Sequence, residues 1–150
     1  MRAALDTNIL VYAEGVNGAL RKSEALALVK KLALGVGVLS LQSLGELFRV
    51  LVRKANWKPA VARNAVLGWW DVFPLVDTSQ AVLVGAIELS VTHRLNFWDG
   101  VILAAAAEGG CRLLLTEDLQ EGFSWRGVTV ANPFAKSPHP LLAQMLRGTP

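Results

Sequence analysis

Short apolar runs alternate with longer, mixed segments along the chain. The apolar runs predict strands over residues 2–6, 36–39, 112–115 and 128–130, with a weaker extended edge at 73–76. The mixed segments predict a helical turn over 9–13 and helices over 19–34, 42–54, 59–70, from the capping residues 77–79 to 95, and over 101–108. Short strands that alternate with helices are typical of an α/β fold. The pattern therefore predicts a three-layer α/β/α sandwich with a central, mainly parallel sheet.

Two of the predicted helices differ in where their apolar residues fall. In the helix that follows residues 77–79, four apolar side chains recur at helical spacing and predict a buried stripe: Val84, Ile87, Val91 and Leu95. The helix over 101–108 is nearly all apolar, which predicts a central position in the fold.

The length of 150 residues fits one domain, and 53% apolar against 18% charged residues supports a sizeable core. We expect this domain to cover residues 1–131. The remaining residues, 132–150, form a Pro-rich tail in which 141–146 predict a short helix.

Composition also restricts the compartment and the chemistry. No apolar run reaches the roughly 18 residues of a membrane span, so we expect a cytoplasmic protein that does not enter a membrane. The single cysteine, Cys111, permits no internal disulfide, and its apolar setting favours a buried thiol. Only two histidines are present, His93 and His139, which argues against a zinc site.

Four carboxylates fall where a parallel sheet would gather them. Asp6 ends the first strand, Glu46 lies on the helix after the second, Asp99 opens the last long helix, and Asp118 follows the strand at 112–115. Ligands of such sheets bind beyond the carboxyl ends of the strands. Taken singly, Asp99 fits a helix cap, Glu46 a solvated residue and Asp118 a turn. Asp6 is the hardest to explain structurally, because a buried strand has little use for a charge at its end.

Brought together, these carboxylates need a positive counter-charge. Each close pair repels by roughly 4 kcal/mol at an effective dielectric near 20. No Lys or Arg adjoins Asp6, Asp99 or Asp118 in the sequence. An all-oxygen site suits Mg²⁺ or Mn²⁺, which hold phosphate oxygens and activate water for phosphodiester hydrolysis. Asn8 and Thr116 can supply neutral oxygens there, although turn and cap roles explain them equally well.

A basic window follows Glu46. Residues 47–70 contain no Asp or Glu, in a chain of net charge +3. Arg49 and Arg53 lie one and two turns beyond Glu46 and could grip phosphates, and Lys54 and Lys58 add charge. Trp57 could stack on an unpaired base. A solvated basic face around a core tryptophan explains the same residues.

Four motifs, in this order and spacing, resemble the PIN-domain ribonucleases, most of all the VapC-type toxins of prokaryotic toxin–antitoxin pairs. The motifs are Leu5-Asp6-Thr7-Asn8-Ile9-Leu10, Ser-Leu-Gly-Glu-Leu around Glu46, Phe97-Trp98-Asp99-Gly100-Val101-Ile102, and Leu114 to Gly122.

The resemblance implies a PIN-like fold over nearly the whole chain and a metal-dependent endoribonuclease. It implies that Asp6, Glu46, Asp99 and Asp118 bind Mg²⁺ or Mn²⁺, with Asn8 and Thr116 in support. It also implies a homodimer and a small antitoxin that inserts beside the active site. Glu117 adds an acid next to Asp118; we favour Asp118 as the metal ligand and Glu117 as a supporting residue.

Two other α/β classes place acids on a parallel sheet. Phosphoacceptor receiver domains, which are regulatory and not catalytic, require a pair of early acids and a late Lys. The only Lys in the second half of this chain is Lys136, beyond the last predicted strand. Phosphatases of the haloacid type require Asp-x-Asp on the first strand, where this chain has Asp6 and Asn8. A non-catalytic, metal-binding or phosphoacceptor-like domain is the alternative to the nuclease.

Overall fold

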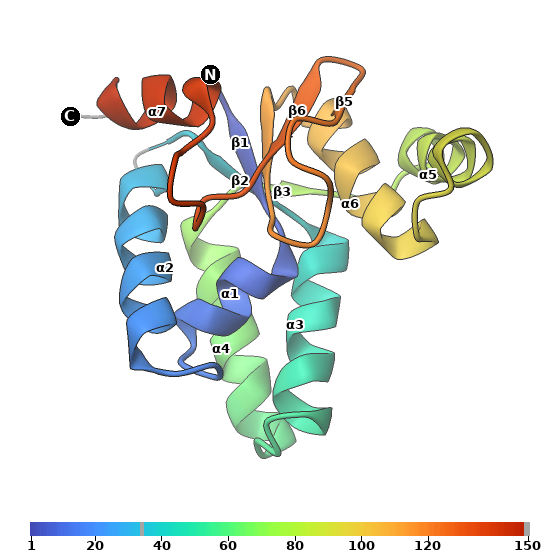
Figure 1. Ribbon diagram of the computed structural model, residues 1–150. Coiled ribbons are helices and arrows are strands. Elements are labelled where there is room, and N and C mark those ends of the chain that lie inside the picture. The colour runs from blue at the N-terminus through green and yellow to red at the C-terminus, as the bar shows by residue number, and fades with distance from the viewer. Residues whose placement is uncertain (34, 149–150) are drawn as a thin grey trace.

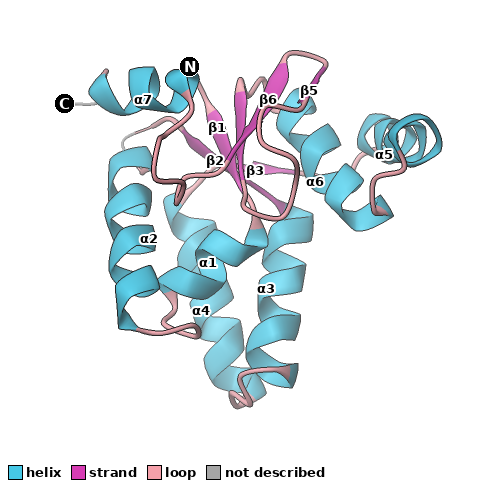
Figure 2. Ribbon diagram, in the orientation of Figure 1, coloured by secondary structure: helices cyan, strands magenta, loops and turns pink. Residues whose placement is uncertain are grey.

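The computed structural model describes residues 1–33 and 35–148, in which the chain forms one central sheet with helices on both sides (Figures 1 and 2). The strands are β1 (Ala3–Leu5), β2 (Gly37–Ser40), β3 (Leu75–Val76), β4 (Leu113–Leu115), β5 (Ser124–Trp125) and β6 (Val128–Ala131). The helices are α1 (Thr7–Ala13), α2 (Ala19–Leu32), α3 (Leu41–Arg53), α4 (Pro59–Val72), α5 (Gln80–His93), α6 (Phe97–Glu108) and α7 (Pro140–Arg147).

The sheet has the strand order β3-β2-β1-β4-β6-β5. All neighbouring strands are parallel except β5, which runs antiparallel to β6. The mainly parallel sheet predicted from the sequence is therefore confirmed. Strand β5 was not predicted, because its two residues carry no pattern of their own and are a strand only through pairing with β6.

Alternating side chains of the strands divide the core into two layers. Ala3 and Leu5 face the core that contains α1, α2, α3, α4 and α7. Ala4 and Leu114 face the other core, which contains α5 and α6. Because side chains alternate along a strand, a sheet covered on both faces needs apolar residues at every position. This arrangement confirms the three-layer sandwich.

The predicted buried stripe of α5 is wrong. Val84, Ile87 and Val91 are 55%, 49% and 78% exposed. The predicted fourth member, Leu95, lies beyond the end of α5 and is only partly buried. The pattern of large apolar residues therefore marks the outer face of this helix.

Small residues explain which face of α5 is buried. A Cβ placed on Gly85 would lie 3.2 Å from the Cβ of Ala104, and one on Gly100 would lie 3.3 Å from the carbonyl oxygen of Ala86. Helices α5 and α6 thus approach each other through glycine and alanine. The buried face of α5 carries Val82 and Leu89 on either side of this contact. Helix α6 is buried from Gly100 to Ala106, as its apolar sequence predicts.

Several element ends differ from the predicted ones. Helix α1 begins at Thr7, directly after β1, and α6 begins at Phe97. Helix α2 ends at Leu32; its predicted last residue, Leu34, lies outside the described residues. In the tail, α7 covers the segment 140–147, and two of its side chains are buried in the first core layer. Within the described residues, no helix is long and apolar enough to span a membrane.

Candidate active site

Asp6 lies at the junction of the two central strands. Strands β1 and β4 are neighbours, with Leu5 paired to Leu115, so the residues that follow them meet at one edge of the sheet. Thr116 Oγ1 donates to Asp6 Oδ2 at 2.6 Å, and the Thr7 backbone N–H donates to Asp6 Oδ1 at 2.7 Å. The sheet order reverses between β1 and β4, which is where open α/β sheets form their binding crevices.

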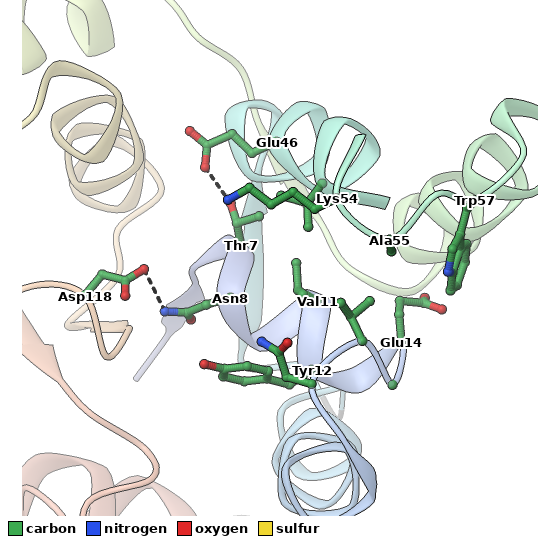
Figure 3. Close-up of a pocket in the computed structure, with 14 residues that line it drawn as sticks. Thr7, Asn8, Val11, Tyr12, Glu14, Glu46, Lys54, Ala55, Trp57 and Asp118 are labelled. Carbon is green, nitrogen blue, oxygen red and sulfur yellow. Dashed lines mark hydrogen bonds between the residues drawn. The ribbon is translucent and has the colours of Figure 1, made fainter. Parts of the chain in front are cut away.

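Glu46 reaches this edge from α3. The helix starts directly after β2, and Ser40 Oγ caps it by accepting from the Ser43 backbone N–H at 3.0 Å. Glu46 then lies in the second turn, where Thr7 Oγ1 donates to Oε2 at 2.9 Å (Figure 3). Gln42 Nε2 donates to Oε1 at 3.0 Å. Two neutral side chains thus fix both oxygens of this carboxylate. Gln42 is four residues before Glu46, a spacing that could have indicated the contact.

Asp118 is held by the helix that Asp6 begins. Asn8 Nδ2 donates to Asp118 Oδ2 at 3.0 Å (Figure 3). Thr116 Oγ1 accepts from the Asp118 backbone N–H at 3.1 Å. Of the buried side-chain nitrogen and oxygen atoms in the described residues, only Asn8 Oδ1 has no hydrogen-bond partner. Asn8 therefore positions one acid and keeps a free acceptor beside it.

Asp99 does not cap its helix. Asn96 takes that role, because its Oδ1 accepts from the Trp98 backbone N–H at 3.0 Å. Asp99 lies in the first turn of α6, half-buried. Burial raises the pKa of Asp99, and the neighbouring charges of Glu46 and Asp118 raise this pKa further.

The pKa of Asp6 reflects its burial first, and then its hydrogen bonds and the neighbouring acids. Burial is the largest influence and raises this pKa from 3.8 to about 7. The hydrogen bonds from Thr116 and Thr7 lower it, and the charges of Asp99 and Asp118 raise it. The ion pairs of the described chain involve other acids, namely Glu24, Glu88 and Glu117. The four predicted acids thus meet without a Lys or Arg partner.

The acids suit a cation that binds oxygen and keeps part of its water shell. Among residues 1–33 and 35–148, no three or more His, Cys, Asp or Glu side chains are arranged to hold an ion by themselves. Mg²⁺ is commonly bound by one or two carboxylates and keeps several waters, so it does not require such a cage. The acids of unrelieved charge and the free Oδ1 of Asn8 form an all-oxygen donor set that suits this ion.

Glu117 points away from the acids. The Tyr12 hydroxyl donates to Glu117 Oε1, and Arg21 Nη2 lies 3.7 Å from Oε2. The guanidinium of Arg21 also lies 4.4 Å from the ring centre of Phe134, in the tail. Burial, followed by the charge of Asp118, raises the pKa of Glu117. Tyr12 was not among the predicted site residues, although its position one turn after Asn8 puts both on one face of α1.

Two of the hollows that adjoin the acids contain predicted RNA-binding residues. The larger, about 680 Å³, contains Asp118 and Glu46 at one end and Trp57 at the other (Figure 3). The second, about 350 Å³, is lined by Glu46 and by the predicted phosphate-binding side chains Arg49, Arg53 and Lys54.

The other two residues predicted to bind RNA lie differently. Trp57 is half-buried against the first core layer, so it forms a wall of the larger hollow. Lys58 is exposed before Pro59, at the start of α4, and lines neither hollow.

Comparison with known proteins gives one family and one group of structures. The PIN domain family model matches residues 3–123. A toxin–antitoxin complex from Klebsiella pneumoniae is 23% identical, with a TM-score of 0.65 over 88% of this chain and 98% of that chain. The sarcin–ricin loop cleaving toxin VapC20 of Mycobacterium tuberculosis is 23% identical, with a TM-score of 0.62 over 75% and 86%. FitAcB from Neisseria gonorrhoeae is 20% identical, with a TM-score of 0.65 over 88% and 98%. No curated protein sequence matches.

Proposed function

The chain belongs to the PIN-domain family, and we propose that it is a Mg²⁺- or Mn²⁺-dependent endoribonuclease that acts as the toxin of a toxin–antitoxin pair. One observation carries the proposal: neutral side chains hold Asp6, Glu46 and Asp118 in place. Neutral donors orient carboxylates without cancelling their charge. The site therefore keeps the negative charge that a divalent cation needs.

Asp6, Glu46, Asp99 and Asp118 are the residues that would hold the ion at the carboxyl edge of the sheet, in part through its bound waters. When bound, a divalent ion supplies positive charge to phosphate oxygens and lowers the pKa of a water. The protein contributes orientation: Thr116 fixes Asp6, Thr7 fixes Glu46, and Asn8 fixes Asp118. Such preorganised groups assist catalysis because they need not reorganise during the reaction.

The basic hollow supports a polyanionic substrate. Arg49, Arg53 and Lys54 are exposed and line one hollow together with Glu46. The phosphates that flank the cleaved phosphodiester can bind in this hollow, while the acids lie at the cleaved bond. Each such contact steepens the slope of log K against log salt concentration by about 0.9 for a duplex and by about 0.7 for a single strand. We therefore propose RNA as the substrate and these side chains as its backbone-binding residues.

A cleavage assay tests the enzyme. Labelled single-stranded and structured RNAs are incubated with Mg²⁺, Mn²⁺ or EDTA, and the wild type is compared with Asp6→Asn. Asp71→Asn is the matched control, because Asp71 is an exposed carboxylate on α4. We expect metal-dependent cleavage by the wild type and Asp71→Asn only. Full activity of Asp6→Asn, or cleavage in EDTA, contradicts the proposal. Metal binding without cleavage of any RNA would favour the non-catalytic alternative.

The toxin role is supported by the complexes that share this fold, which include the toxin–antitoxin complex from Klebsiella pneumoniae. We propose that a small antitoxin protein binds this chain and that the target is RNA in the cytoplasm. Induced expression should arrest growth of the host cell. Asp6→Asn should abolish the arrest and Asp71→Asn should not, when both variants are expressed at equal levels. Equal arrest by wild type and Asp6→Asn contradicts a toxic nuclease activity.

We also propose a homodimer, supported by the outer face of α5. Its exposed apolar side chains include Val84, Ile87 and Val91, spaced by three and four residues. Two copies can pack the same stripe about a twofold axis. Light scattering at micromolar concentration should give twice the 16.2 kDa mass of the chain. Val91→Asp should lower the measured mass. Leu20→Asp on α2 is the matched control and should leave the mass unchanged, because Leu20 is as exposed as Val91, 77% against 78%, but lies on another helix. A wild-type mass of one chain contradicts the dimer.

A further inference from the structure

Trp98 is exposed at the start of the most buried helix. Side chains of α6 are buried without interruption from Gly100 to Ala106, yet Trp98 is 52% exposed. Burying a tryptophan is strongly favourable, so an indole left half in water suggests a binding role. Trp98 also immediately precedes Asp99, one of the four acids.

The indole forms one side of a small hollow. About 310 Å³ in volume, it is lined by Trp98 from α6 and by Gln42, Gly45, Glu46 and Arg49 from α3. Glu46 lines this hollow, the basic hollow and the larger hollow that contains Asp118. The hollow beside Trp98 therefore adjoins the acid Glu46 and the proposed phosphate-binding side chain Arg49.

Local contacts restrain Trp98 before anything binds. Its backbone N–H donates to the helix-capping Asn96 Oδ1 at 3.0 Å, which fixes the start of α6. Its ring packs edge-to-face on Phe97, with centroids 4.9 Å apart and an angle of 72° between the planes. A ring held by a capped helix and a second aromatic side chain loses little entropy when a ligand stacks on it.

We propose that Trp98 is a stacking platform for one unpaired RNA base, the base of a nucleotide next to the cleaved phosphate. This inference rests on the proposed function and specifies its substrate: the nuclease cuts where a base is free to leave its stack. Bases within a duplex are stacked on one another and cannot reach an indole. Gln42 and Arg49, in the same hollow, offer donors to the edge of the base or to its phosphate.

The lining of the hollow favours a base over a protein side chain. It contains an acid, a guanidinium and an amide around one aromatic face. The outer face of α5, with exposed Leu83, Val84 and Ile87, is more apolar and is the face suited to a second copy of the chain. Stacking on an aromatic side chain tolerates any base, so the platform predicts a requirement for an unpaired nucleotide and not for one sequence.

Binding of RNA measured apart from cleavage tests the platform. A labelled single-stranded oligomer is titrated in Ca²⁺, in place of Mg²⁺, and followed by fluorescence anisotropy. A set of oligomers in which one base at a time is replaced by an abasic site is titrated in parallel. For the wild type, one abasic position should weaken binding by about 5- to 100-fold. Trp98→Ala should bind the intact oligomer more weakly by the same factor and be insensitive to that abasic position.

Two variants control for other causes. Trp98→Phe keeps an aromatic face and should recover most of the affinity. Trp70→Ala removes an indole of similar exposure, 51%, from α4 and should bind as the wild type does. The proposal is overturned if Trp98→Ala binds equally well, if it keeps its sensitivity to every abasic position, or if it changes the mass in light scattering, which would assign Trp98 to a protein interface. A failed cleavage assay in Mg²⁺ and Mn²⁺ contradicts the nuclease itself, whatever the binding result.

Discussion

Replacing Asp6 by Asn should stabilise the metal-free protein while removing its activity. Burial of Asp6 raises its pKa from 3.8 to about 7, so an ionised Asp6 is costly at neutral pH. Asn has nearly the same shape and carries no charge. Its Oδ1 can accept from the Thr7 N–H, and Thr116 Oγ1 has a second lone pair to accept from its Nδ2. The fold should therefore tolerate the substitution.

The size and sign of the effect follow from proton linkage. The folded state holds its proton on Asp6 more tightly than the unfolded chain does. The associated stability is fully present below pH 3.8, is lost as the pH rises, and is gone above about pH 7. The free energy lost across this range is at most about 4 kcal/mol. Asn does not titrate. The unfolding free energy of Asp6→Asn, relative to that of the wild type, should therefore rise by up to about 4 kcal/mol between pH 4 and pH 8.

Urea unfolding at a series of pH values, in EDTA, measures this difference. At pH 8, Asp6→Asn should be more stable than the wild type, with an unfolding free energy higher by up to about 4 kcal/mol. At pH 4 that gain should vanish, leaving only the effect of the changed hydrogen bonds. A difference in unfolding free energy that is the same at pH 4 and pH 8 would refute the reasoning, because it would mean that Asp6 ionises as easily in the folded state as in the unfolded chain.

Three further substitutions test how the structure supports the site. Gly37→Ala should destabilise by about 1–3 kcal/mol in urea unfolding, because the new Cβ would lie 2.4 Å from Phe73 Cε1. Tyr12→Phe removes the hydrogen bond to Glu117 and should cost about 1 kcal/mol by the same measurement, with an unchanged stability counting against the bond. Glu117→Gln should cleave RNA within a few-fold of the wild type, whereas Asp118→Asn should lose about a hundredfold or more; the reverse order would make Glu117 the metal-binding acid.

The sequence predicted the acids better than it predicted their partners. Each acid follows or begins an element, and a parallel sheet brings the carboxyl ends of its strands together by topology alone. The hydrogen bond from Thr7 to Glu46 instead depends on how α1 packs against α3, across 39 positions of sequence. Thr7 reads as a turn residue until that packing is known. Similarly, only the structure separates Glu117 from Asp118, since adjacent residues at the end of a strand are indistinguishable by pattern.

For helix α5 the sequence pattern was strong, but it predicted the wrong buried face. Large apolar residues at helical spacing predict a buried face, but burial requires a partner surface of matching shape. The partner here is α6, which lies close to α5 at Gly85. Val82, Gly85, Ala86 and Leu89 form the buried face, and Val84, Ile87 and Val91 stay outside. A helix that is apolar on two faces can therefore carry two interfaces, one within the chain and one to another molecule.

The choice of neutral donors around the acids links the stability of the protein to its proposed cation. An Arg beside Asp6 would relieve the repulsion and stabilise the fold at neutral pH, but it would also satisfy the charge that an ion needs. Thr116 orients Asp6 and leaves that charge in place. The metal-free protein then carries an unfavourable energy that a cation can recover, and an ion at a hundred times its Kd adds about 2.7 kcal/mol to stability. Because the four acids lie on four separate segments of the chain, the same ion would also hold together the elements that form the site.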